Sequence, residues 1–181
     1  MNSKSFSFYC YALCALVLSG CVSQIYGVDL DRPVPTETIK YIEVTDSRIF
    51  KELWLRDLET DQSVGMFPLQ VRPSEVEILR EYLSQMLNGD LGGITVNIAL
   101  YTLMVRTKTS TFSNNDLYCI AESKVTVNGE KLKIENLRSI SKNTKTFATA
   151  FSVIGKAILD QCLQNHAYVI ARFVKTGETG K

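Results

Sequence analysis

The chain has 181 residues, of which 20 are lysine or arginine, 19 are aspartate or glutamate and one is histidine. Lys4 is the only charged residue among the first 20, so the other 161 residues carry equal numbers of basic and acidic side chains. That length predicts one domain with its own core. Net neutrality argues against a nucleic-acid-binding protein, because such binding depends on a basic excess that neutralises phosphates.

Residues 1–20 are predicted to be a lipoprotein signal peptide. Behind the single charge lie an apolar core at Phe6–Val17, two small residues and a cysteine. The residues that match the lipobox of type II signal peptides are Leu18, Ser19, Gly20 and Cys21. In that motif the Cys21 thiol takes up a diacylglycerol before cleavage. The core is shorter than the roughly 20 residues of a spanning helix. An ordinary secretory signal cut nearby and a retained anchor are the alternatives.

Residues 21–38 are predicted to be a tether between the lipid and the folded domain. They include Pro33 and Pro35 among small and polar residues, and they show no apolar period. The residue after Cys21 is Val22 and not aspartate, which favours the outer membrane under the sorting rule of enteric bacteria. We therefore expect a protein held at the periplasmic face of the outer membrane by the lipid on Cys21.

Residues 39–175 are predicted to form one domain, which begins with a strand. Alternating side chains predict this strand over Ile39–Val44, with Ile42 and Val44 toward the core. The segments expected after it are a turn or strand end at 45–48, a short strand at about 49–56 and a loop at 57–68.

A helix is predicted over about Glu75–Asn88. Ser74 and Glu77 have the spacing of a capping box, and Asn88-Gly89 is typical of a helix end. The apolar stripe expected to face the core consists of Val76, Leu79, Leu83, Met86 and Leu87.

Three consecutive strands are predicted next, at Ile94–Lys108, Leu117–Val127 and about Glu130–Ile140. In the first, the residues expected to face the core are Val96, Ile98, Leu100 and Met104. Asn128-Gly129 is typical of a two-residue hairpin turn, which would place Val125 opposite Leu132 on the core face. The outer face of this hairpin carries charged side chains and is expected to be solvated; a ligand surface is the alternative.

A second helix is predicted from a cap at Asn143 or Thr144 to about Gln164. The residues along its apolar face are Phe147, Phe151, Ile154, Ile158 and Cys162. Ala167–Val174 either extends this helix or adds an edge strand, and residues 176–181 form a tail. The expected fold is α+β, with an antiparallel or mixed sheet of four to five strands and two helices packed on one face.

Cys119 and Cys162 are the two cysteines expected to remain as thiols after signal cleavage and acylation. Cys119 is in phase with the core-facing residues of its strand, and Cys162 lies on the apolar face of the second helix. An oxidising compartment permits a disulfide between them. Two separate buried thiols, packed as small hydrophobic residues, are the alternative.

Sequence motifs for catalysis or cofactor binding do not appear. His166 is the only histidine, which leaves little for a histidine-based triad or a multi-histidine metal site. The sequence has no nucleophile elbow, P-loop or dinucleotide-binding glycine pattern. We therefore expect a non-enzymatic protein with no cofactor and no metal, in which His166 is a structural residue near a helix end.

The phrase Val44-Thr45-Asp46-Ser47-Arg48 and the hairpin-then-helix layout around 125–158 resemble the YajG-like family of small bacterial outer-membrane lipoproteins. The likeness covers about residues 39–164, with an insertion-like stretch at 50–71. Auxiliary lipoproteins of lipid-transport systems and the plug lipoprotein of the lipopolysaccharide translocon share the general layout. The resemblance implies an outer-membrane lipoprotein with no assigned reaction, and it supplies no catalytic residues.

Two functions are consistent with this sequence. The first is a structural or adaptor lipoprotein that binds a protein partner of the cell envelope. The alternative is an accessory or carrier lipoprotein of a lipid or lipopolysaccharide transport system. An apolar cavity between the helices and the sheet would favour the carrier, whereas an exposed apolar patch or an unpaired strand edge would favour the adaptor.

Overall fold

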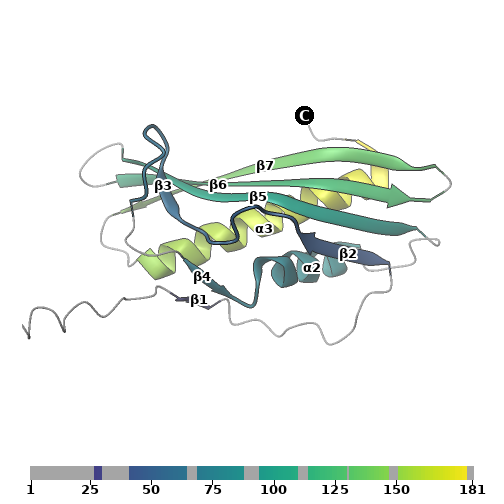
Figure 1. Ribbon diagram of the computed structural model, residues 1–181, viewed down its shortest axis with the longest axis horizontal. Coiled ribbons are helices and arrows are strands. Elements are labelled where there is room, and N and C mark those ends of the chain that lie inside the picture. The colour runs from purple at the N-terminus through teal and green to yellow at the C-terminus, as the bar shows by residue number, and fades with distance from the viewer. Residues whose placement is uncertain are drawn as a thin grey trace, which may run out of the picture.

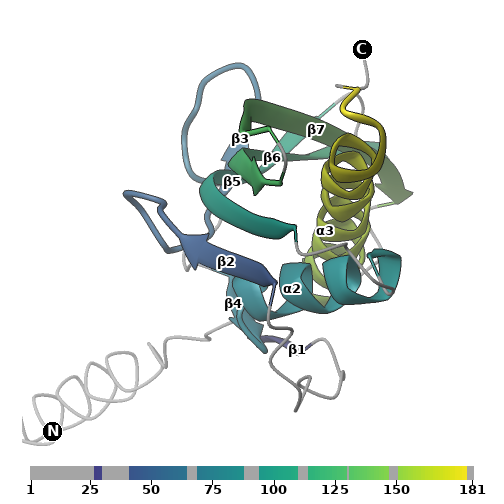
Figure 2. The ribbon, with the colours of Figure 1, turned by 90° about the vertical axis from the view of Figure 1, so that its right-hand side faces the viewer.

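The structure is a computed structural model that describes residues 27–29, 41–64, 69–87, 94–109, 114–129, 131–146 and 151–178. Its main feature is a five-stranded mixed sheet with both helices on one face (Figures 1 and 2). The α+β prediction is confirmed, with the sheet mixed. The predicted signal peptide, the lipobox and Cys21 lie outside the described residues.

The sheet has the strand order β2-β5-β6-β7, and β3 also pairs with β5. The strands are β2 at Ile42–Asp46, β3 at Leu55–Asp57, β5 at Thr95–Thr109, β6 at Asn114–Asn128 and β7 at Lys133–Thr146. Strands β2 and β3 run parallel to β5, whereas β5, β6 and β7 are antiparallel neighbours. Because β2 and β3 pair with separate stretches of β5, the segment 47–54 connects two parts of one sheet edge.

Strand β2 buries Ile42 and Val44, as their alternation with polar residues predicted. The expected second strand is shorter than predicted, since β3 begins only at Leu55. Ile49 and Phe50, at the start of the predicted strand, are instead exposed to solvent.

Strand β5 contains an irregularity that reverses which of its side chains face the core. The register with β6 shifts between Leu100 and Thr102, which makes Tyr101 an extra residue. The buried side chains are Val96, Ile98 and Leu100 before this point and Leu103 and Val105 after it. The prediction that Met104 faces the core is therefore wrong, because a bulge interrupts the alternation of period two.

The turn between β6 and β7 is longer than predicted. Val127 pairs with Lys133, so five residues separate the paired positions. This register places Glu122 opposite Arg138, and their side chains form an ion pair at 3.3 Å. The predicted two-residue turn would have placed Glu122 opposite Glu135, so the observed pairing replaces a repulsive contact with an attractive one.

Helix α2, Glu75–Met86, begins at a capping box, as predicted. The Glu77 backbone N–H donates to Ser74 Oγ at 3.4 Å, and the Ser74 backbone N–H donates to the Glu77 carboxylate at 2.8 Å. The hydrogen bonds from Ser74 hold the pKa of Glu77 below its usual value.

We expect Ser74→Ala to lower the free energy of unfolding by about 1 kcal/mol, because one backbone N–H of the first turn loses its acceptor. Urea denaturation measures this change. Ser84→Ala is the matched control, since the Ser84 hydroxyl only donates to a carbonyl of its own helix, that of Glu81 at 2.7 Å. Equal losses in the two variants would contradict a capping role.

Helix α3, Phe151–Thr176, begins and ends later than predicted. Strand β7 continues to Thr146 and so includes both residues predicted to cap this helix. The segment 167–174, for which helix and strand were both open, is helical. The buried side chains that continue the core-facing stripe there are Ala167, Ile170, Ala171, Phe173 and Val174.

Two neighbouring contacts hold α3 against the sheet. The first is a disulfide between Cys119 and Cys162, whose Cα atoms lie 5.7 Å apart. One helical turn later, His166 is fully buried, with Nε2 2.8 Å from Ser123 Oγ and Nδ1 3.0 Å from Ser139 Oγ. His166 thus lies well inside the helix, where both ring nitrogens have hydrogen-bond partners, and not near a helix end as expected.

Burial lowers the pKa of His166 to about 4 from a usual value of 6.5, because a buried site disfavours the charged ring. Between these two pH values the unfolded chain binds a proton that the folded protein does not bind. The contribution of neutral His166 to the free energy of unfolding is therefore fully present above pH 6.5 and is lost as the pH falls to 4. We expect the loss to reach about 3 kcal/mol, measured by urea denaturation across this range.

His166→Gln is the control for this pH dependence, because glutamine can hydrogen-bond but does not titrate. Other groups that titrate between pH 6.5 and 4 contribute equally to both proteins. The variant should therefore lose less stability than the wild type over this range, and identical slopes would contradict the role of His166.

A second, two-stranded sheet lies beside the helices. Its parallel strands are β1 at Gly27–Asp29 and β4 at Gln70–Arg72. Since β1 falls within residues 21–38, the predicted tether is not free of structure there, and only five residues separate Cys21 from β1. No helix in the described ranges is long and apolar enough to cross a membrane.

Candidate functional site

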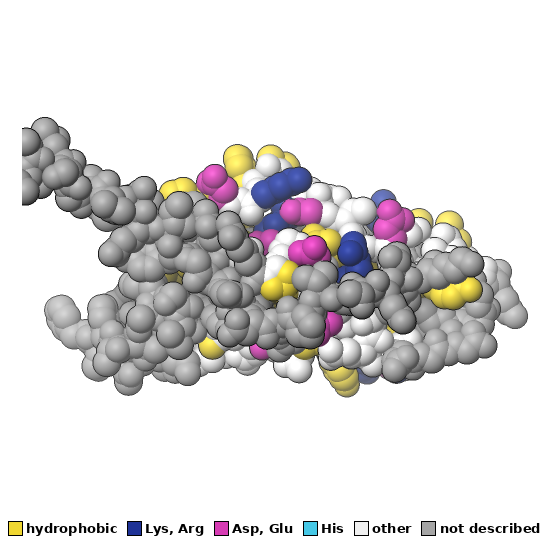
Figure 3. Space-filling model, turned by 90° about the horizontal axis from the view of Figure 1, so that it is seen from below, with side chains coloured by type: hydrophobic (Ala, Val, Ile, Leu, Met, Phe, Trp, Pro, Cys, Tyr) yellow, Lys and Arg dark blue, Asp and Glu magenta, His cyan; other side chains and the backbone are white. Residues whose placement is uncertain are grey.

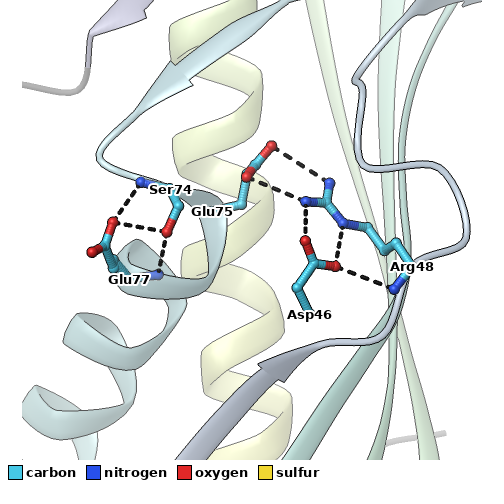
Figure 4. Close-up of polar contacts among 5 residues, drawn as sticks. All are labelled: Asp46, Arg48, Ser74, Glu75 and Glu77. Atoms are coloured by element: carbon cyan, nitrogen blue, oxygen red, sulfur yellow. Dashed lines mark hydrogen bonds and ion pairs between the residues drawn. The ribbon is translucent and has the colours of Figure 1, made fainter.

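A buried ion cluster lies where β2 ends. Arg48, two residues after the strand, is only 6% exposed. Its Nε and Nη2 donate to the two carboxylate oxygens of Asp46, both at 2.9 Å. Its Nη1 and Nη2 also donate to Glu75, at 3.4 and 3.3 Å. Figure 4 shows the guanidinium between these carboxylates, one from β2 and one from the first residue of α2.

The electrostatics of this cluster favour the charged forms of Asp46 and Arg48. The side-chain hydrogen bond from Arg48 is the main reason that the pKa of Asp46 lies below its usual value. Burial acts to lower the pKa of Arg48, but the hydrogen bonds and charges of Asp46 and Glu75 outweigh it, so this pKa is raised. The Asp and Arg of the Val44–Arg48 phrase thus join β2 to α2 and fix the start of the segment that follows.

A groove of about 580 Å³ opens beside the ion cluster, between the segment 48–61 and the stretch 101–106 of β5. The apolar and aromatic residues in its lining are Ile49, Phe50, Trp54, Tyr101, Leu103 and Met104. At the charged end, Asp61 pairs with Arg106 at 2.6 Å and with Arg56 at 3.3 Å. We call this the β5 groove.

Two apolar side chains stand out at the rim of the β5 groove. Ile49 is 90% exposed and Phe50 is 82% exposed, and Lys51 follows them. The chain between β2 and β3 projects away from the sheet in Figure 2. Figure 3 shows hydrophobic side chains extending past charged ones at an edge of the molecule. We call residues 49–51 the apolar loop.

Apolar side chains also cross the face of the sheet that points away from the helices. Met104 pairs with Ile120, and Ile120 pairs with Ile140, so the three lie side by side on β5, β6 and β7. Ile140 is 56% exposed. We call these three residues the outer row. The prediction that this face is charged holds on either side of the outer row. The ion pair of Arg138 with Glu122 lies on one side of the row, and that of Lys142 with Asp116 lies on the other.

The outer row ends at an open strand edge. In the part of the chain that the structure describes, β7 pairs with β6 alone. Its free edge therefore leaves backbone groups available for a further strand.

Asp46 and Arg48 of the Val44–Arg48 phrase form the ion cluster, whereas the two cysteines singled out from the sequence lie elsewhere in the domain. Cys119 and Cys162 are bonded in the core, and Leu18–Cys21 lies outside the described residues. Sequence analysis missed the apolar loop, although a strand at 49–56 would have required one of Ile49 and Phe50 to face solvent. It also missed the outer row, which depends on the strand register. Among the described residues, no three metal-binding side chains come together.

The sequence matches no protein-family model and no curated protein. Among solved structures, the chain is similar to a Xanthomonas campestris protein of the DUF330 family, with 10% identity and a TM-score of 0.46 over 84% of this chain and 96% of that one. It is also similar to a minor lipoprotein from Acinetobacter baumannii, with 10% identity and a TM-score of 0.41 over 77% of this chain and 93% of that one. Similarity at this level assigns neither a family nor a function.

Proposed function

We propose that this protein is a bacterial envelope lipoprotein, held by an acylated Cys21 at the periplasmic face of the outer membrane. Its domain acts there as a non-enzymatic adaptor that binds another envelope protein. The observation that carries this proposal is the lipobox Leu18-Ser19-Gly20-Cys21, directly after an apolar core and a single positive charge. The resemblance to the YajG-like lipoproteins points to the same location.

The adaptor role is supported by the outer row and the open edge of β7. The outer row runs from half-buried Met104 through buried Ile120 to exposed Ile140, and an apolar row of this kind flanked by charged pairs has the composition of a protein-binding surface. The space between helices and sheet, where a carrier would hold its ligand, is occupied by side chains in the described part of the chain. Residues there that are at most 1% exposed include Leu79, Leu83, Ile98, Leu159 and Leu163.

Incorporation of radiolabelled palmitate tests the anchor. We expect label in the wild type and none in Cys21→Ala, because the thiol is the site of acylation. Membrane fractionation of the same cells should place the wild type with the outer membrane. Equal labelling of the two proteins would overturn the anchor.

Site-specific photo-crosslinking in cells tests the adaptor role. A photoreactive amino acid at Ile140 should give an adduct with an envelope protein, because this side chain is exposed at the end of the outer row. The control places the same amino acid at Tyr168, which is similarly exposed on α3. Equal adducts at both positions, or lipid alone at Ile140, would contradict the adaptor and favour the carrier.

A further inference from the structure

We propose that the apolar loop is a second membrane contact, which seats the domain on the lipid surface that holds its anchor. The inference rests on the proposed function, because it assumes that Cys21 is acylated. It adds an orientation: the edge of the sheet with the apolar loop faces the bilayer, while β7 and the exposed end of the outer row remain free for a protein.

The exposure of the loop is the first observation. Ile49 and Phe50 are the most exposed large hydrophobic side chains of the described residues, at 90% and 82%. Exposure of two adjacent apolar side chains of this size to water is unfavourable, and their transfer into the acyl region of a bilayer lowers the free energy. Their base is fixed, since Arg48 immediately before them is held by Asp46 and Glu75.

The position of the loop relative to the anchor is the second observation. Five residues separate Cys21 from Gly27, so β1 begins at most about 20 Å from the acylated residue. Gly27 pairs with Gln70 in β4, and the preceding residue, Leu69, bridges to Leu53, with Leu69 N–H donating to the Leu53 carbonyl at 2.6 Å. Leu53 is three residues after Phe50, so the chain enters the domain close to the apolar loop.

The side chains around the loop are the third observation. Lys51 follows Phe50, and Trp54 and Tyr101 line the groove beside it. Tryptophan and tyrosine favour the boundary between water and acyl chains, and lysine can keep its ammonium group in the headgroup layer while its stem lies deeper. Both acids of the groove lining have partners: Asp61 pairs with Arg56 and Arg106, and Glu52 accepts a hydrogen bond from the Trp54 indole N–H at 3.2 Å. A lipid surface therefore fits this rim.

Trp54 is the only tryptophan of the chain, which makes it a reporter beside the apolar loop. The experiment uses the full acylated protein in vesicles of phosphatidylethanolamine and phosphatidylglycerol, with or without bromine atoms near the headgroup end of the acyl chains. Bromine quenches tryptophan on contact. We expect at least a twofold loss of Trp54 fluorescence in brominated vesicles.

The variant Ile49→Ser/Phe50→Ser should remove this quenching, and it should fold because both side chains are exposed. Ile134→Ser is the matched control, since Ile134 is 52% exposed on β7, and it should leave the quenching unchanged. If the wild type carries palmitate but its Trp54 fluorescence is not quenched, the loop contact is overturned and the anchor is not. Quenching in a protein without palmitate would support the loop contact and overturn the anchor. A photoreactive amino acid placed at Phe50 that forms an adduct with a protein, in a sample that shows no quenching, would also overturn the inference.

Discussion

Arg48→Ala is expected to lower the free energy of unfolding by about 3–5 kcal/mol, a large part of the stability of a domain of this size. The variant leaves the carboxylates of Asp46 and Glu75 together without the guanidinium that lies between them. Glu75 is itself buried, so water cannot fully replace the lost hydrogen bonds. Urea denaturation at neutral pH, followed by circular dichroism, measures the change.

Arg56→Ala is the matched control for this prediction. Arg56 also pairs with an acid, Asp61 at 3.3 Å, but both side chains are about half exposed. An exposed pair contributes less than about 1 kcal/mol, so the control should be nearly neutral. A loss below about 1 kcal/mol for Arg48→Ala as well would contradict the importance of the buried cluster.

A third variant distinguishes the loss of the guanidinium itself from the cost of leaving two carboxylates without a partner. Arg48→Met combined with Asp46→Asn and Glu75→Gln removes every charge of the cluster and keeps similar volumes. Since most of the penalty comes from buried charges without partners, this triple variant should be more stable than Arg48→Ala. If it is equally unstable, the geometry of the guanidinium is what matters.

The elements that sequence analysis predicted well are those fixed by local patterns. The alternation in β2 and the capping box of α2 involve residues within a few positions of one another, and both are as expected. The helix boundaries of α3 were less accurate, because the length of β7 is set by its pairing with β6 and not by a signal near Asn143.

The errors in the sheet have a common physical cause. A bulge at Tyr101 and a turn of five residues after Val127 each shift the alternation of side chains by an odd number of positions. Every residue beyond such a point changes face. Met104 therefore lies in the outer row and not in the predicted core. Leu132, which was predicted to oppose Val125 on the core face, is 63% exposed in the turn, and Val125 pairs with Glu135 instead.

The candidate site was harder to predict than the fold, because its parts meet only through tertiary structure. Glu75 lies 27 residues from Arg48 along the chain, and no local pattern connects them. Likewise, Met104, Ile120 and Ile140 come together only in the observed register. The lipobox could be identified because four consecutive residues contain its whole chemistry.

Reduction of the disulfide between Cys119 and Cys162 is expected to lower the free energy of unfolding by about 4 kcal/mol. The bond closes a loop with a sequence separation of 43, and the loss follows from the greater entropy of the open unfolded chain. Urea denaturation with and without dithiothreitol measures it. Cys119→Ala/Cys162→Ala is the control, in which the reductant should have no effect.

The expected signature is lower stability with little change in the folded state. After reduction, α3 still packs on the sheet through its buried stripe, and His166 still contacts Ser123 and Ser139. Circular dichroism without denaturant should therefore be the same with and without dithiothreitol, and thiol reagents should label the cysteines only as the protein unfolds. A reductant that melts α3 without urea would show that the bond, and not the packing, holds the helix in place. Unchanged urea curves would show that the two thiols are not joined in solution.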